Sequence, residues 1–309
     1  MMKNIRILYM GTPELSSIIL KGLIDKGYNI VGVVAQEDKP VGRKGIIEPV
    51  PTKKVALENN IPVFQPKKIR DDFSFIKDLN IDLIITCAYG QIIPQEVLDL
   101  PTIDSINVHG SLLPKYRGAS PIQQSLINGD EYTGVTIMKM IYKMDAGDMI
   151  HQKSFKIEKD DNYTSLCQKI ARCGLDALIE ILPSIIDRTA KYIPQEEELV
   201  TYCSKITKEQ EHLDLNNSAK NVLGWIKALS ETPGAFTYLD NQVFKIYDAE
   251  VVPLNGPVGQ IIQADNKGLI VACKNDALSL KIIQKQGKKK MDYKSLINGD
   301  RTLLNNILK

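Results

Sequence analysis

The sequence predicts two domains, a mostly parallel α/β sheet in the first part of the chain and a small antiparallel β-barrel at its end. Short apolar runs alternate with longer helical patterns in the first half, which is typical of a parallel sheet covered by helices. The last third instead carries several short strands separated by turns. A chain of 309 residues is long enough to bury a core in each domain.

The elements of the first domain follow from its apolar periodicity. Strands are predicted at residues 5–9, 30–35, 83–87 and 105–109, with helices at 14–26, 53–59 and 73–79 between them. Pro121 then opens a helix to Asn128, and strands at 134–140 and 149–157 flank a turn that contains Asp145. Residues 164–186 place apolar side chains three to four positions apart, which indicates one long amphipathic helix packed on the sheet.

The division of the chain follows from a change in composition after this helix. A polar, acidic stretch indicates a linker, so we predict a first domain of residues 1–189, a linker of residues 190–205 and a second domain of residues 206–309. The second domain begins with a helix at 218–229. Its strands are predicted at 235–239, 243–250, 259–264, 269–272 and 278–284.

Composition and charge are those of an ordinary globular protein. Apolar residues make up 43% of the chain, charged residues 25%, and the net charge is only +2. From residue 206 to the end, fourteen Lys and Arg residues stand against eleven Asp and Glu residues. This mildly basic balance suits contact with a polyanion, although an ordinary solvated face explains the charge equally well.

The cysteines and histidines argue against a disulfide framework and against a metal site. The five cysteines form no CxxC pair, and none of the three histidines lies at metal-ligand spacing from another. We therefore expect a reducing compartment and no bound metal. No signal peptide and no run long enough to span a bilayer is found. We expect a cytoplasmic protein with no membrane association, and a monomer, because no large exposed apolar patch can be inferred.

The segment NVHG at residues 107–110 carries the strongest functional signal. Alternate residues of a strand share a face, so Asn107 and His109 are expected to project together before Gly110 ends the strand. An amide donor, an imidazole and a carboxylate such as Asp145 suffice for acid–base chemistry at a carbonyl carbon. They do not suffice for hydrolysis through an acyl-enzyme, because no activated nucleophile accompanies them.

The position of His109 at a strand end places it where open α/β sheets bind ligands. The sequence contains neither the Gly-x-Gly-x-x-Gly fingerprint nor the Gly-x-x-x-x-Gly-Lys phosphate loop, which argues against a nicotinamide dehydrogenase and a phosphate-loop nucleotidase. With Asn107 and a glycine turn beside it, His109 favours a functional role over a structural one. Asp145 taken alone is typical of a surface turn.

Two basic clusters are candidates for phosphate contacts. A Pro/Gly-rich loop after the second strand contains three positive residues: Lys39, Arg43 and Lys44. A second cluster near the C-terminus contains Lys288, Lys289 and Lys290, with Lys285 and Lys294 beside them. A plain solvated loop or face explains each cluster equally well.

The order of the motifs resembles the folate-dependent formyltransferases. The motifs are NVHGSLLPKYRGASPI at 107–122, GVTIM at 134–138 and DAGDM at 145–149. The segments GTP at 11–13, AYGQIIP at 88–94 and PVGR at 40–43 look like the branch of this family that acts on tRNA. The resemblance extends over essentially the whole chain, including the second domain.

The resemblance implies a Rossmann-like catalytic domain joined to a smaller OB-like β-barrel domain. It implies transfer of the formyl group of 10-formyltetrahydrofolate, a co-substrate, to the α-amino group of initiator methionyl-tRNA. The family's catalytic trio maps onto Asn107, His109 and Asp145. Its folate-contacting turn maps onto Ser111, Leu112, Leu113 and Pro114. On this reading, the tRNA contacts are expected at Lys39, Arg43, Lys44, Lys288, Lys289 and Lys290.

The chemistry of the three residue types agrees with such a transfer. Asn107 can donate to the oxyanion that forms when an amine attacks the formyl carbon. His109 can donate to the oxyanion or carry a proton to the leaving folate nitrogen, and Asp145 can orient the imidazole or accept the amine proton. The sequence leaves this division of proton transfers open.

Two other functions remain open at this point. A formyltransferase for a sugar nucleotide or for glycinamide ribonucleotide keeps the same trio, so only the basic loop and the basic barrel favour tRNA. A non-catalytic RNA-binding protein on the same scaffold is the alternative from another class, and the intact trio argues against it.

Overall fold

The computed structural model describes residues 4–41 and 45–309, and the chain packs into two units. The first unit contains the chain up to Gly118 together with Tyr132–Lys156 and Cys167–Cys203. The second unit contains Ala119–Glu131, Ile157–Leu166 and Ser204–Lys309. The domain limits at 189 and 206 stay a prediction, and the packing adds that two short earlier segments belong with the C-terminal unit.

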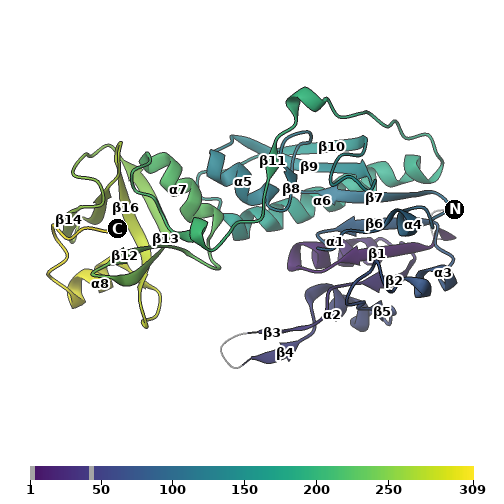
Figure 1. Ribbon diagram of the computed structural model, residues 1–309, viewed down its shortest axis with the longest axis horizontal. Helices are drawn as coiled ribbons and strands as arrows, with labels where there is room; N and C mark the ends of the chain where they lie inside the picture. The colour runs from purple at the N-terminus through teal and green to yellow at the C-terminus, as the bar shows by residue number, and fades with distance from the viewer. Residues whose placement is uncertain (1–3, 42–44) are drawn as a thin grey trace. The chain divides into compact units, whose positions relative to one another are not determined.

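A seven-stranded, mostly parallel sheet forms the centre of the first unit. Its strands are β1 (Ile7–Gly11), β2 (Ile30–Val34), β5 (Val63–Phe64), β6 (Leu83–Cys87), β7 (Asp104–His109), β9 (Tyr132–Lys139) and β10 (Met149–Lys156). They follow one another as β10-β9-β7-β6-β1-β2-β5 (Figure 1). The five strands from β7 to β5 are parallel to one another, and β9 pairs antiparallel with both β7 and β10. The predicted α/β sheet is confirmed.

Four helices of the first unit lie between its parallel strands, and a fifth, α6, follows β10. They are α1 (Glu14–Asp25), α2 (Pro51–Glu58), α3 (Ser74–Asp78), α4 (Gln95–Leu98) and the long α6 (Tyr163–Ile186). Every residue of β1 and β6 is buried, as expected for central strands covered on both faces. At Gly174 of α6 a Cβ atom would lie 2.9 Å from Val108 of β7, so α6 packs directly against the strand that carries the predicted trio's first two members.

The basic segment predicted as a loop after β2 instead begins as a hairpin. β3 (Lys39–Val41) pairs antiparallel with β4 (Ile46–Glu48), and Figure 1 shows the pair extending away from the sheet. β-Branched residues on both strands favour extended backbone and explain the pairing. Arg43 and Lys44 lie outside the described residues.

The second unit is an antiparallel sheet with helices packed on it. Its elements are α5 (Pro121–Asn128), α7 (Ala219–Ala228), β12 (Ala235–Leu239), β13 (Gln242–Val252), β14 (Ile261–Asp265), β15 (Gly268–Ala272), β16 (Ala277–Lys285), β17 (Met291–Asp292) and α8 (Tyr293–Gly299). The strand order is β12-β13-β16-β15-β14, and β17 pairs with β16. Apolar side chains from the strands and from α7 form its core.

The C-terminal residues close this sheet into a barrel. The Lys309 and Tyr238 backbones exchange two hydrogen bonds of 3.0 Å, and the Leu308 amide donates to the Gly259 carbonyl at 2.8 Å. β12 and β14 are the two edge strands of the sheet. The tail therefore bridges them, because it bonds to β12 and to the residues just before β14. The predicted antiparallel barrel is confirmed. In the described chain, no helix is both long and apolar enough to cross a bilayer.

Candidate active site

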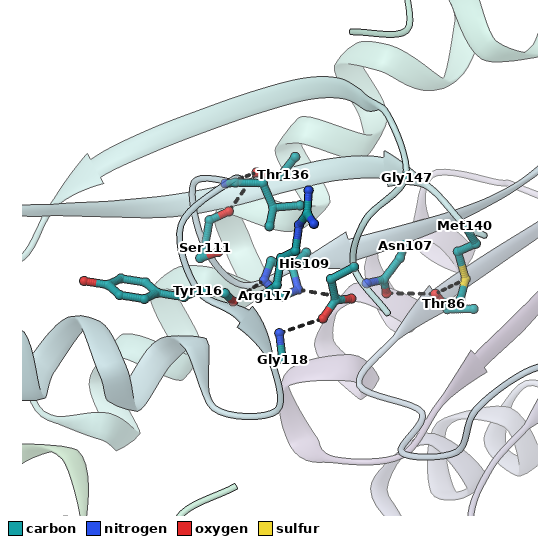
Figure 2. Close-up of polar contacts among 12 residues, drawn as sticks. Thr86, Asn107, His109, Ser111, Tyr116, Arg117, Gly118, Thr136, Met140 and Gly147 are labelled. Carbon is teal, nitrogen blue, oxygen red and sulfur yellow. Dashed lines mark hydrogen bonds and ion pairs between the residues drawn. The ribbon is translucent and has the colours of Figure 1, made fainter. Parts of the chain in front are cut away.

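The structure brings the three predicted catalytic residues together at the carboxyl end of β7. Figure 2 shows Asn107 and His109 there. Asn107 and His109 lie two positions apart on β7, so their side chains share a face of the strand. Asp145 comes from the connection between β9 and β10, in the left-handed backbone region with φ of 49°. Its Oδ1 atom lies 3.7 Å from Nδ1 of His109. This edge of the sheet is where open α/β folds bind ligands.

The imidazole of His109 is held by one nitrogen and is available at the other. Its Nε2 atom lies 2.9 Å from the backbone carbonyl of Tyr116, which can only accept a hydrogen bond (Figure 2). Nε2 therefore carries a proton in this arrangement, and Nδ1 is the nitrogen that faces Asp145. The ring is buried, with 4% of its residue surface exposed. Nδ1 is consequently the ring nitrogen at which a neutral imidazole can accept a proton.

The carboxylate of Asp145 is oriented by a backbone amide. The Gly118 N–H donates to Oδ2 of Asp145 at 2.9 Å, which leaves Oδ1 toward His109. Gly118 belongs to β8 (Arg117–Gly118), which pairs in parallel with β11 (Tyr202–Cys203). Its φ is 125°, and a Cβ atom there would lie 2.1 Å from the Cys203 carbonyl oxygen. Only glycine fits this position, since any side chain would separate the two strands.

The carboxamide of Asn107 is also oriented. The Thr86 hydroxyl, on the neighbouring strand β6, donates to its Oδ1 atom at 2.8 Å (Figure 2). The amide nitrogen is thus the remaining polar end, and it has no hydrogen-bond partner within the part of the chain that the structure describes. A donor fixed in this way, close to an imidazole and a carboxylate, can stabilise an oxyanion.

The turn predicted to contact folate is tied to β9. Thr136 donates from its hydroxyl to the Ser111 carbonyl at 2.8 Å and accepts from the Leu113 amide at 3.0 Å. The Ser111 hydroxyl donates to the Lys115 carbonyl, and the side chains of Ser111 and Leu113 are buried. Leu112 and Pro114 are half-buried. Folate contact at this turn stays a prediction, carried by Leu112, Pro114 and the backbone.

The predicted tRNA-binding lysines lie on exposed parts of both units. Lys39 is exposed on β3 in the first unit, and Lys288, Lys289 and Lys290 are exposed on the turn between β16 and β17 in the second. The Lys290 ammonium lies 3.7 Å from the ring centroid of Tyr247 and 3.5 Å from a carboxylate oxygen of Glu231. Its charge is thus partly neutralised, whereas Lys288 and Lys289 have no ion pair within the described residues.

A group of buried polar contacts behind Asp145 is not evident from the sequence. Gln195 donates from its amide nitrogen to the carbonyls of Asp145 and Gly147, at 2.9 and 2.7 Å. Its amide oxygen accepts from Nε of Arg117 at 2.9 Å. Gln195 lies in the segment predicted as a linker, whose acidic, polar composition hides this contact. The nearest sequence signal is the motif at 107–122, which contains Arg117, the partner of Gln195.

Neither a nucleophilic thiol nor a metal centre accompanies the trio. Burial raises the pKa of the Cys87 thiol to about 12, so it remains protonated at neutral pH and packs as an apolar side chain. Over residues 4–41 and 45–309, no three His, Cys, Asp or Glu side chains gather closely enough to hold a metal ion.

Comparison with known proteins places both parts of the chain in one family. The family model for formyl transferase matches residues 3–182, and the model for the formyl transferase C-terminal domain matches residues 205–301. A methionyl-tRNA formyltransferase of Staphylococcus aureus is 42% identical over 304 residues, which cover 97% of each chain.

Solved structures support the same fold at lower identity. An N-formyltransferase from Helicobacter canadensis, in complex with folinic acid and dTDP-3-aminofucose, has a TM-score of 0.68 at 17% identity, covering 91% of this chain and 99% of that chain. HypX from Aquifex aeolicus in complex with tetrahydrofolic acid has a TM-score of 0.66 at 18% identity and is covered by this chain over 48% of its length. This chain thus spans about half of HypX, and both likenesses concern the fold.

Proposed function

Because the chain belongs to the formyl transferase family, we propose that it transfers the formyl group of 10-formyltetrahydrofolate to the α-amino group of initiator methionyl-tRNA. The convergence of Asn107, His109 and Asp145 at one sheet edge is the observation that carries the proposal. The Staphylococcus aureus relative, matched over 97% of both chains, supports the tRNA substrate. The N-formyltransferase from Helicobacter canadensis, at 17% identity, supports the fold alone, so it gives less support to a nucleotide sugar as the acceptor.

In the proposed reaction, the neutral α-amine attacks the formyl carbon of the folate donor. The new carbon–nitrogen bond forms as the bond between the formyl carbon and the folate nitrogen breaks. The amine loses one proton and the folate nitrogen gains one, so no outside oxidant, reductant or base is consumed. The tetrahedral centre between these steps carries an oxyanion, and the Asn107 amide nitrogen is the donor poised to stabilise it.

The proton transfer is assigned to Nδ1 of His109. Its Nε2–H is engaged by the Tyr116 carbonyl, so a neutral ring offers its lone pair only at Nδ1. A proton taken there from the attacking amine forms an imidazolium 3.7 Å from the Asp145 carboxylate, which stabilises the charge. The same nitrogen then returns the proton to the leaving folate nitrogen, and the ring is restored.

Exposed lysines on each unit are candidates for contact with the tRNA backbone. We place phosphate contacts at Lys39 and at the Lys288–Lys290 turn, because exposed ammonium groups bind phosphate without requiring a particular base. Arg43 and Lys44 extend this proposal beyond the described residues. The monomeric state and the cytoplasmic location inferred from the sequence stay predictions.

The decisive experiment supplies 10-formyltetrahydrofolate with a labelled formyl group and compares possible acceptors. Label is expected in charged initiator methionyl-tRNA, with much less in charged elongator methionyl-tRNA as the matched control. A dTDP-aminosugar and glycinamide ribonucleotide provide the competing arms. Transfer to either small molecule but not to initiator tRNA would replace the proposed acceptor, and absence of transfer to every acceptor would remove the catalytic proposal.

A further inference from the structure

The segment 195–203, here called the strap, is bonded to the residues that orient His109 and Asp145. These two catalytic groups are held by the Tyr116 carbonyl and the Gly118 amide, which lie on either side of Arg117. The Thr201 carbonyl accepts from the Arg117 amide at 2.9 Å, and the Thr201 hydroxyl accepts from the Tyr116 amide at 2.9 Å. The chain around β8 is therefore fixed by hydrogen bonds to the strap.

The strap also reaches the turn that carries Asp145. Gln195 is buried, with 9% of its surface exposed, and its single amide nitrogen donates to the Asp145 and Gly147 carbonyls. Both protons of that nitrogen are thus used on one turn, at 2.9 and 2.7 Å. Asp145 has a positive φ of 49°, a left-handed conformation that aspartate tolerates and that contacts with the rest of the chain can hold in one place. Gln195 supplies two of those contacts.

Gln195 is itself fixed from the other side. Its amide oxygen accepts from Arg117, whose guanidinium is 1% exposed and also bonds the Glu197 carboxylate at 3.0 Å. This partner determines which end of the Gln195 amide is oxygen and which is nitrogen, because a guanidinium can only donate. The arrangement requires an amide: a residue with two acceptors could satisfy Arg117 but not the two carbonyls of the Asp145 turn.

We propose that Gln195 is a positioning residue for the transfer reaction, which sets the place of the Asp145 carboxylate beside Nδ1 of His109. This inference rests on the proposed function, because it assigns Gln195 a role through the catalytic pair. Misplacement of a reacting group by about 1 Å can reduce turnover on the order of a hundredfold. Loss of both donors is therefore expected to lower kcat by about 10- to 100-fold while leaving the KM for each substrate within about twofold.

The test uses Gln195→Glu in the full-length protein. A glutamate retains the oxygen that Arg117 needs, which favours folding, but it loses both donors and sets an oxygen against the two carbonyls of the turn. Glu198→Gln serves as the matched control, because it makes the reverse exchange of amide and carboxylate at an exposed neighbour on the same strap. Gln195→Met, which keeps the volume, provides a second variant if the glutamate protein unfolds. Thermal melting is recorded for each.

A double-mutant cycle separates positioning from general destabilisation. If Gln195 acts through Asp145, Gln195→Glu costs about 10- to 100-fold in the parent and less than about threefold in an Asp145→Asn background. An equal loss in both backgrounds, a parent-like kcat, or a loss confined to KM overturns the inference. The parent assay keeps the two proposals apart: a parent that formylates no acceptor contradicts the proposed function, whereas an active parent with an indifferent Gln195 contradicts only this inference.

Discussion

Asp145→Asn tests the charge pair at the centre of the proposed mechanism. Asparagine keeps an oxygen for the Gly118 amide, so the turn retains its 2.9 Å anchor, while the negative charge is lost and an amide NH2 group replaces the oxygen that faces Nδ1 of His109. The charge that this variant removes lies 3.7 Å from the nitrogen that becomes protonated, and both side chains are largely buried. At an effective dielectric constant of about 20, such a pair interacts with about 4 kcal/mol. We expect kcat to fall about a thousandfold.

The assay is the single-turnover rate of formylation at saturating methionyl-tRNA and folate donor, so that binding does not limit the result. Asp148→Asn is the matched control, because it removes a carboxylate from the same connection, three residues further along the chain. Its rate is expected to stay within about threefold of the parent, because no ion pair joins the half-buried Asp148 to His109 within the described residues. A loss below about tenfold in Asp145→Asn would refute the assignment of imidazolium stabilisation to this carboxylate.

Two further predictions concern the oxyanion donor and the stability of the second unit. Asn107→Leu removes the amide nitrogen and is expected to lower kcat by about 10² to 10³, with folate KM little changed; steady-state kinetics with the folate donor varied check this. Asp300 accepts from Lys285 and Thr302, which lower the pKa of its carboxyl to about 2. Because this pKa is lower in the folded chain than in the unfolded one (about 3.9), the ionised carboxylate stabilises the fold above the unfolded value, and this stabilisation is lost as the pH falls through the folded pKa. Asp300→Asn is therefore expected to lower the free energy of unfolding by at most about 2 kcal/mol at pH 7 and by about half of that at pH 3. Urea unfolding followed by the fluorescence of Trp225, the single tryptophan, measures both values; an equal deficit at the two pH values would contradict the linkage.

Most of the regular elements could be predicted because their signals are local. The apolar runs at 83–87 and 235–239 and the helix at 121–128 agree with the structure to the residue. The missed elements are short ones, such as α4 (Gln95–Leu98), β8 and β11. A pair of two-residue strands has too few residues to show a period, and it exists only because two distant segments meet.

In the candidate active site, too, only the local arrangement could be predicted from the sequence. Asn107 and His109 share a face because the strand has a period of two, so their juxtaposition was predictable from spacing. That Asp145 approaches His109, rather than lying on a surface turn, depends on where the connection between β9 and β10 lies once the sheet is formed. The motif resemblance anticipated this meeting, but residue spacing could not, because 36 positions separate the two residues.

The sequence by itself determined the fold class, the two β-architectures and the shared face of two of the three predicted catalytic groups, since periodicity and motif order are properties of neighbouring residues. Only the tertiary structure decided which nitrogen of His109 faces Asp145 and which end of the Asn107 amide is free. It also decided that Gln195, in an acidic stretch resembling a linker, bonds the Asp145 turn. The physical reason is that hydrogen-bond partners far apart in the chain are selected by packing of the whole unit, and no local pattern records that choice.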